Sequence, residues 1–83
     1  MRTRTDDTAT STFEAERPRL AAIAYRMMGT PDDADDIVQD AWLRWQRADR
    51  SVIVEPAAWL TTVTTRLAID RLTSARARRE TYV

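Results

Sequence analysis

Cysteine, histidine and lysine are absent from this 83-residue sequence, and glycine occurs once. Without cysteine there is neither a disulfide framework nor a thiolate metal site. Without histidine or cysteine, the common acid–base and nucleophile arrangements of hydrolases are missing. A single glycine, Gly29, excludes a glycine-rich phosphate loop. We therefore expect a protein that is not an enzyme and that uses no cofactor and no metal ion.

Turn-forming residues are also scarce, with three prolines, Pro18, Pro31 and Pro56, beside the one glycine. Such sparse turn chemistry disfavours a β-sandwich or barrel and favours a few helices. Apolar runs are too short for a membrane span or a signal-peptide core. The sequence therefore predicts one small all-α domain in the cytoplasm, without a membrane partner.

Charge is balanced overall but not along the chain. Thirteen arginines offset thirteen acidic residues. Residues 31–40 hold five aspartates and no basic residue, whereas residues 66–79 hold five arginines and a single acid, Asp70. This asymmetry indicates either two charged partners or two solvated helix ends that complement helix dipoles.

The first helix is expected over residues 13–28, after a disordered tail at residues 1–12 that has almost nothing to bury. The domain would then occupy residues 13–83. Pro18 removes one backbone hydrogen bond, so the first turns are bent or the helix begins near it. The apolar stripe of this helix comprises Leu20, Ile23, Ala24 and Met27.

Two further helices follow. Thr30 and Pro31 supply an N-cap and a first-turn proline for a helix that continues to about residue 47. Its apolar face is formed by Ala34, Ile37, Val38, Ala41, Trp42 and Trp45. Residues 48–55 break the pattern and are interpreted as a loop. Pro56 starts the third helix, whose core stripe of Leu60, Val63 and Leu67 is continued by arginine.

Three features are candidates for function. The polar face of the second helix carries an exposed aliphatic residue, Leu43, which is typical of an interface centre with a polar rim. A merely solvated face is the alternative. This face comprises Asp32, Asp36, Gln39, Leu43 and Arg47.

The second feature is the arginine-rich end of the third helix, which suits a phosphate backbone. Its alternative is plain dipole complementation. The arginines concerned are Arg66, Arg71, Arg76, Arg78 and Arg79. The third feature is the loop at residues 48–55, which either forms a pocket for a base taken out of its stack or only connects two helices.

Two strings in the sequence resemble region 2 of the extracytoplasmic-function class of RNA polymerase sigma factors. Ala-Asp-Asp-Ile-Val-Gln-Asp-Ala-Trp at residues 34–42 is similar to that class's polymerase-binding helix. Pro-Ala-Ala-Trp-Leu at residues 56–60, with Leu-Ala-Ile-Asp-Arg-Leu at residues 67–72, is similar to its promoter-reading helix. The string Trp-Leu-Thr-Thr-Val-Thr-Thr-Arg-Leu at residues 59–67 resembles the sigma-J-like subgroup, which carries a C-terminal SnoaL-like domain.

The resemblance implies a three-helix region 2 domain that directs transcription initiation. Asp36, Gln39 and Asp40 would bind the β′ clamp helices of core RNA polymerase. The third helix's arginines would hold phosphates of the −10 promoter element, although Arg66 stands where the family usually has asparagine. Non-template-strand bases would be held by Arg50, Ser51, Val52, Ile53 and Val54.

The resemblance also implies a regulator, either an anti-sigma protein or a SnoaL-like domain in cis, and a chain that is only part of a sigma factor. Two other functions remain open from the residues. One is a helical adaptor that binds proteins and no nucleic acid. The other is a stand-alone regulator that binds duplex DNA, which the short basic stretch and neutral net charge disfavour.

Overall fold

Three α-helices form the domain. The structure, a computed structural model, describes the backbone of residues 4–81 and the side chains of residues 8–78. Helix α1 spans Arg4–Met28, α2 spans Pro31–Arg47 and α3 spans Pro56–Thr81, with a 3-10 turn, η1, at Arg50–Val52. Residues 4–81 contain no strand. The expected all-α, three-helix fold is thus confirmed.

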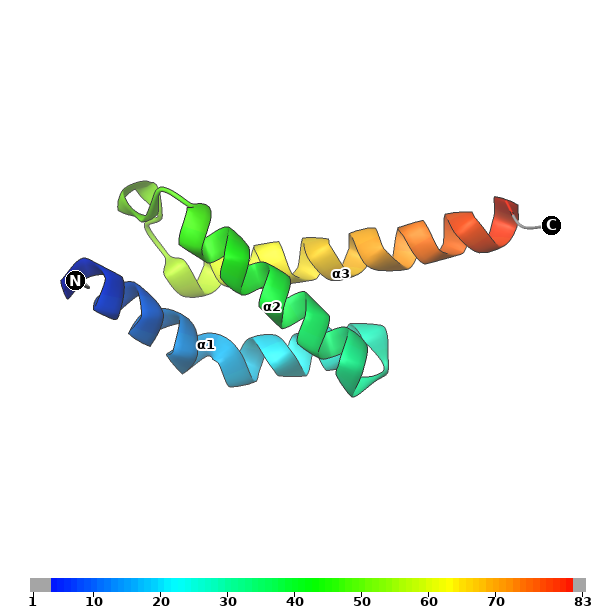
Figure 1. Ribbon diagram of the computed structural model, residues 1–83, viewed down its shortest axis with the longest axis horizontal. Helices are drawn as coiled ribbons and strands as arrows, with labels where there is room; N and C mark the ends of the chain where they lie inside the picture. The colour runs from blue at the N-terminus through cyan, green and yellow to red at the C-terminus, as the bar shows by residue number, and fades with distance from the viewer. Residues whose placement is uncertain (1–3, 82–83) are drawn as a thin grey trace.

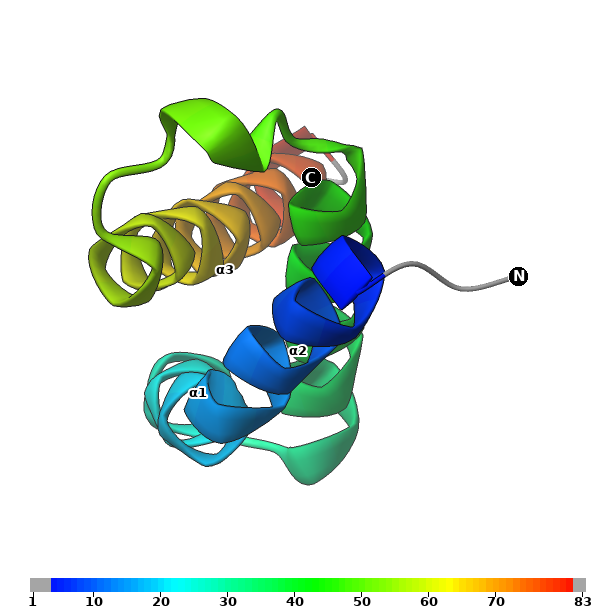
Figure 2. The same cartoon turned by 90° about the vertical axis from the view of Figure 1, so that its left-hand side faces the viewer.

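The helices pack against one another in all three pairs. Figure 1 shows α2 crossing α1 and α3, while α3 continues past both neighbours toward the C-terminus. The end-on view in Figure 2 shows the three helices around a common centre. The domain is elongated, with extents of 52 × 25 × 21 Å. The far half of α3 therefore lies outside the helical bundle.

The turn between α1 and α2 has the local chemistry that its sequence predicts. Gly29 has a φ of 87°, a left-handed conformation in which a side chain would be strained, and its N–H donates to the carbonyl of Tyr25 at 2.8 Å. Thr30 Oγ1 accepts a hydrogen bond from the backbone N–H of Asp33 at 3.2 Å, and Pro31 follows at the first helical position. These contacts fix where α2 starts and therefore which residues face outward.

The core is built from all three helices. Its aromatic centre pairs Phe13 with Trp42, at 5.0 Å between ring centroids, and Trp45 with Trp59, at 5.7 Å. The buried apolar residues are Phe13, Leu20, Ala24, Ala34, Ile37, Val38, Ala41, Trp45, Leu60 and Ala68. The face predicted for α2 is confirmed, except that Trp42 is only half-buried.

Helix α1 starts earlier than expected. The sequence placed a tail at residues 1–12 and the start of the first helix at residue 13, whereas α1 begins at Arg4. Ala9 packs against the core, and its carbonyl accepts a hydrogen bond from Trp45 Nε1 at 2.9 Å. An indole N–H that becomes buried needs an acceptor, and an extended α1 supplies one. Residues 1–3 lie outside the described residues.

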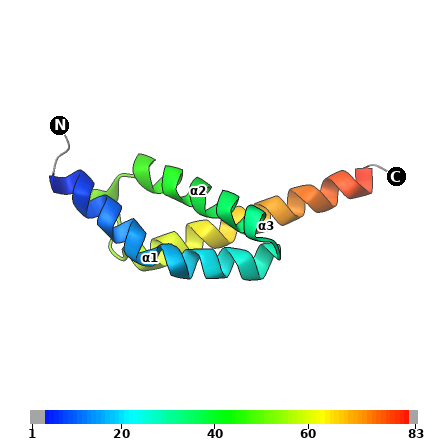
Figure 3. The ribbon, with the colours of Figure 1, turned by 60° about the horizontal axis from the view of Figure 1, so that its bottom comes forward.

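Pro18 lies inside α1 and does not delay its start. Proline cannot donate to the carbonyl four residues earlier, and its ring crowds that carbonyl, so a bend is expected. Figure 3 shows the ribbon of α1 changing direction between its blue first half and its cyan second half. The bend lets both halves of α1 follow the core. Leu20 and Ala24 of the predicted stripe are fully buried, whereas Ile23 and Met27 are half-buried.

The buried stripe of α3 also differs from the prediction. Leu60, Thr64 and Ala68 are fully buried, whereas the expected Val63 and Leu67 are half-buried at its edge. The small side chains of Thr64 and Ala68 allow α3 to approach its neighbours closely. Hydrophobicity alone favours the larger Val63 and Leu67 as core residues. The buried positions are instead the next residues along the chain, Thr64 and Ala68.

An arginine joins the start of α3 to α1. Arg19 Nη1 donates to Thr61 Oγ1 at 2.5 Å, and its Nη2 donates to the carbonyl of Ala57 at 3.0 Å. Glu16, three residues earlier on α1, accepts from Arg19 Nε at 2.8 Å and orients the guanidinium. This contact sets the position from which α3 runs out of the bundle.

Candidate polymerase and nucleic-acid interfaces

The outward face of α2 comprises the six residues assigned to one surface from the sequence. Five of them are exposed, and Asp40, at the edge, is half-buried. Leu43 is 37% exposed and lies opposite the buried Ala41 and Trp45 side of the helix. The six residues are Asp32, Asp36, Gln39, Asp40, Leu43 and Arg47. A single apolar side chain is therefore surrounded by charges and an amide on a convex helix face.

Two of these aspartates also form ion pairs with α3. Arg71 Nη1 lies 3.2 Å from Asp36 Oδ2 and 4.0 Å from Asp33 Oδ1. Arg71 Nη2 lies 3.7 Å from Asp40 Oδ2. The sequence assigned Arg71 to a different surface and missed Asp33. The spacing of residues 33, 36 and 40 puts them on one flank of α2, but only the tertiary structure shows which cation faces that flank.

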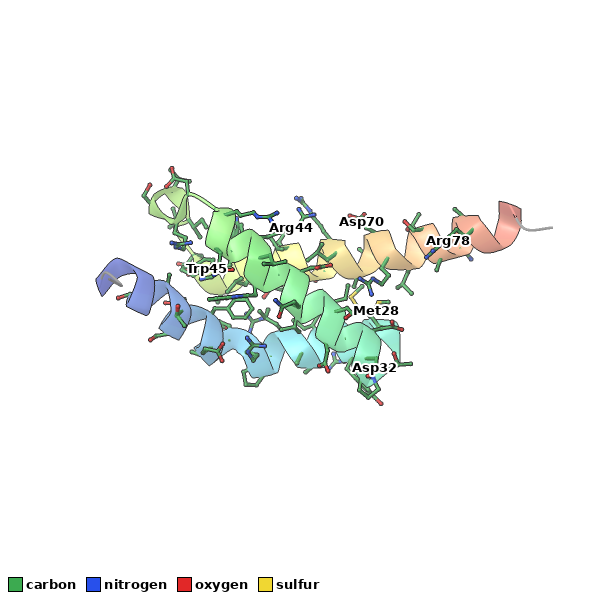
Figure 4. All side chains as sticks on the ribbon, viewed as in Figure 1. Met28, Asp32, Arg44, Trp45, Asp70 and Arg78 are labelled. Carbon is green, nitrogen blue, oxygen red and sulfur yellow. The ribbon has the colours of Figure 1, made fainter. Side chains whose placement is uncertain are left out.

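The other arginines of α3 divide by position. Arg66 is exposed on the part of α3 that packs in the bundle, while Arg76 and Arg78 are exposed on the protruding end. Figure 4 shows Arg78 on that end. The side chain of Arg79 lies outside the described residues. The structure thus presents Arg76 and Arg78 to solvent on a single projecting helix.

Two large apolar side chains accompany these arginines. Ile69 and Leu72 are 48% and 42% exposed on the part of α3 where its core contacts end. Both lie outside the stripe of Leu60, Val63 and Leu67 that the sequence predicted. A helix that shows arginine and aliphatic side chains together offers both ionic and apolar contacts to a partner.

The loop between α2 and α3 is ordered by its own hydrogen bonds. Asp49 Oδ1 accepts from the hydroxyl of Ser51 at 2.5 Å and from its backbone N–H at 3.1 Å. These two bonds, the hydroxyl's first, hold the pKa of Asp49 below its ordinary value of 3.8. Asp49 is thereby the N-cap of η1.

The five loop residues predicted to hold a base do not all face solvent. Arg50 turns inward, where its Nη1 donates to the carbonyls of Trp45 and Gln46 at 2.8 and 3.1 Å and caps the end of α2. Ile53 packs against the core. Ser51, Val52 and Val54 are exposed, the last at 88%. The loop therefore offers three of the five predicted side chains to a partner.

A shallow hollow lies near this loop, between the end of α2 and the start of α3. It is lined by Arg44, Arg47, Ala48, Trp59 and Val63. Of these residues the sequence assigned only Arg47 to a binding surface, and it predicted Val63 as part of the core stripe of α3. An aromatic ring beside two arginines is suited to a flat, negatively charged group.

Two other kinds of functional element are absent from the part of the chain that the structure describes. No group of three or more acidic side chains there is arranged to hold a metal ion. Between residues 4 and 81, none of the helices has both the length and the apolar composition that crossing a membrane requires.

The family model for Sigma-70 region 2 matches residues 12–78, which is most of the chain and nearly all of the bundle. The chain belongs to the Sigma-70 region 2 family. The resemblance drawn from the strings at residues 34–42 and 56–72 is thereby confirmed. The residues matched include the outward face of α2, the loop and Arg66, Arg71, Arg76 and Arg78 of α3.

Curated relatives place this region 2 domain beside the extracytoplasmic-function class. It is 60% identical over 72 residues to the ECF RNA polymerase sigma factor SigJ of Mycobacterium tuberculosis strain H37Rv, and the match covers 87% of this chain and 23% of the relative. It is 39% identical over 74 residues to the Probable ECF RNA polymerase sigma factor SigI of M. tuberculosis strain CDC 1551, covering 89% and 26%. The region 2 domain thus spans about a quarter of the length of these relatives. No solved structure matches it significantly.

Proposed function

We propose that this chain is the promoter-recognition domain of an alternative sigma factor. It binds core RNA polymerase through the outward face of α2 and the −10 promoter element through the loop and the arginines of α3. The observation that carries this proposal is Leu43, an exposed aliphatic side chain at the centre of a polar face, on a chain of the Sigma-70 region 2 family. The domain works by binding, in the cytoplasm where polymerase and chromosome meet.

The outward face of α2 fits the β′ clamp helices of polymerase. A central apolar residue with a rim of acids and an amide is the usual composition of a protein–protein contact. Asp36, Gln39 and Asp40 supply the polar rim, and Leu43 supplies the apolar centre that polymerase would cover. Because α2 is fixed by its cap and by the aromatic core, this face is preorganised for a rigid partner.

The test of this surface is direct binding to core polymerase. We expect Leu43→Glu or Gln39→Ala to weaken binding by about 1–3 kcal/mol, as for residues at an interface centre. Ala22→Glu is the control for Leu43→Glu, since Ala22 is exposed on α1 rather than on the six-residue face of α2. Circular dichroism would show that each variant remains folded. Wild-type affinity for both face variants would overturn the assignment.

The −10 element is bound, in this proposal, by two parts of the surface with different tasks. Arg66, Arg76 and Arg78 contact phosphates and position the strand, as does Arg79 by its place in the sequence. The exposed loop residues Ser51, Val52 and Val54, with the hollow over Trp59, hold a base of the non-template strand. Stacking contributes about 1–3 kcal/mol per base, so strand opening is driven by binding energy.

The test of the DNA surface is a salt series with a fluorescent single-stranded −10 oligonucleotide and polymerase present. Removing one arginine that binds a phosphate should flatten the log–log salt slope by roughly 0.7. Arg76→Ala with Arg78→Ala should therefore flatten it, with little change in sequence preference. The matched control is Arg17→Ala with Arg26→Ala, which removes the same charge from α1. Equal slopes for the two double variants would leave the end of α3 a solvated terminus and favour the adaptor function.

The outward face of α2 is also the proposed binding site of a regulator. An anti-sigma protein, or a SnoaL-like domain in the same polypeptide, would act by covering the outward face of α2 and competing with polymerase. The curated relatives are about four times the length of the matched region, so they have room for additional domains. Competition with polymerase for the wild-type chain, abolished by Leu43→Glu, would identify such a regulator.

A further inference from the structure

Arg71 lies at the boundary between the two proposed surfaces. It is 35% exposed on α3, one turn after the buried Ala68, at the point where α3 leaves the bundle. Its guanidinium faces three carboxylates of α2, those of Asp33, Asp36 and Asp40, at 3.2–4.0 Å. One positive charge is therefore shared by three negative charges, and the cluster has a net charge of −2.

This cluster disfavours the use of Arg71 on DNA by the free domain. The hydrogen bond from Nη1 to Asp36 Oδ2 at 3.2 Å occupies an edge of the guanidinium that a phosphate would need. A phosphate brought to Arg71 would also approach the surplus carboxylates, and like charges repel at this range. The cluster thus opposes strand binding at the root of the basic end of α3.

Two of these carboxylates, those of Asp36 and Asp40, belong to the surface proposed for polymerase. Asp36 is 65% exposed and Asp40 is 45% exposed, so both can be reached from outside while they hold Arg71. Ion pairs this exposed contribute little to stability and are readily exchanged for other partners. A cation on polymerase that pairs with Asp36 or Asp40 would therefore compete directly with Arg71.

From this geometry we infer that Arg71 couples the two surfaces. In the free domain it is neutralised by α2, and polymerase contact with Asp36 and Asp40 releases it to a DNA phosphate. Binding of polymerase and of DNA then strengthen each other by the same factor, because linkage is reciprocal. The inference rests on the proposed function, and it adds how the two activities are connected.

The experiment measures binding of the 83-residue chain to a single-stranded −10 oligonucleotide at low salt, without polymerase. Asp36→Asn with Asp40→Asn removes two of the competing carboxylates, as polymerase would neutralise them. We expect DNA affinity to rise about 3- to 5-fold more than in the matched control. That control is Asp32→Asn with Asp35→Asn, which changes the net charge equally on the same helix. Asp32 and Asp35 are exposed, and neither forms an ion pair with the described side chains.

The second half of the experiment repeats both double variants with Arg71→Gln. The extra gain should disappear, because no guanidinium remains to be released, while Arg71→Lys should restore part of it. An equal rise for the two aspartate pairs, or an extra gain that persists with Arg71→Gln, would overturn the coupling. Failure of the proposed DNA surface can be told apart from failure of the coupling. In that case Arg76→Ala with Arg78→Ala would leave DNA binding unchanged in the wild-type chain and in both aspartate double variants.

Discussion

The indole Nε1 of Trp45 donates a hydrogen bond to the carbonyl oxygen of Ala9 at 2.9 Å. This bond joins the early part of α1 to the end of α2, across 36 residues of sequence. On its other side the ring packs against Trp59. The part of α1 around Ala9 is thus part of the fold, and it contacts α2 close to the point where the loop begins.

Removing residues 1–12 should destabilise the domain. The deletion leaves Trp45 Nε1 without an acceptor and removes Ala9 from the core. The hydrogen bond contributes about 0.5–1.5 kcal/mol, and 1 kcal/mol corresponds to roughly 4–8 °C in a domain of this size. Thermal unfolding followed by circular dichroism measures the change. An unchanged melting temperature would mean that these residues behave as a tail.

The hydrogen bond of Trp45 can be separated from its bulk. Trp45→Phe should lower stability by about 1 kcal/mol more than Trp42→Phe. Trp42 packs on Phe13, and none of the described side chains or carbonyls accepts a hydrogen bond from it. Denaturant unfolding of both variants provides the comparison. Equal costs would show that the indole N–H contributes nothing beyond the ring.

Arg19 should contribute to stability through α3. Arg19→Ala removes the contacts with Thr61 and the carbonyl of Ala57 and should cost about 1 kcal/mol. Arg17→Ala is the control, because the ion pair of Arg17 with Glu14 stays within α1. We expect the control to cost less in urea unfolding. A larger loss of unfolding free energy for Arg17→Ala than for Arg19→Ala would show that the contacts of Arg19 with α3 do not stabilise the domain.

The exposed and the packed residues of the loop should behave differently. Val52→Ser and Val54→Ser should cost on the order of 1 kcal/mol in preference for the −10 sequence, with stability retained. Ile53→Ala should instead cost about 1–2 kcal/mol of stability, because this side chain packs on the core. Oligonucleotide competition and thermal unfolding measure the two effects. If the valine variants keep full sequence preference, the loop is only a connector.

Acid should loosen the loop through Asp49. The carboxyl's pKa is lower in the folded chain than in the unfolded one, so its bonds to Ser51 stabilise the loop above about pH 4. This contribution disappears as the pH falls through the lowered pKa. Ser51→Ala removes the larger cause and should raise the pKa of Asp49 toward 3.8. An NMR titration of the Asp49 carboxyl tests this, and an unchanged pKa would refute it.

Local signals in the sequence predicted α2 well. Thr30 and Pro31 mark its start, and the 3.6-residue period of its apolar residues separates the buried side from the face around Leu43. Both signals depend only on neighbours within a few residues, so the sequence suffices to read them. The start of α3 at Pro56 was predicted for the same reason.

Features that depend on distant partners were not predictable in this way. The start of α1 was missed because the contribution of Ala9 to stability depends on its hydrogen bond with Trp45, which lies 36 residues further along the chain. The pairing of Arg71 with three aspartates required the crossing of α2 and α3. Arg50 was assigned to a partner, yet the free carbonyls at the end of α2 hold it. In each case a tertiary contact competes with the role that local pattern indicates.

Site-specific crosslinking to core polymerase shows whether the outward face of α2 is the polymerase-binding surface. A photo-crosslinking amino acid is placed at position 43 on the outward face of α2, and at position 22, exposed on α1, as the control. We expect a crosslink from position 43 to the β′ subunit, absent from position 22 and abolished by an excess of the unmodified chain. A crosslink to β′ from position 22 alone, or none from position 43 while the chain still binds polymerase, would contradict this assignment.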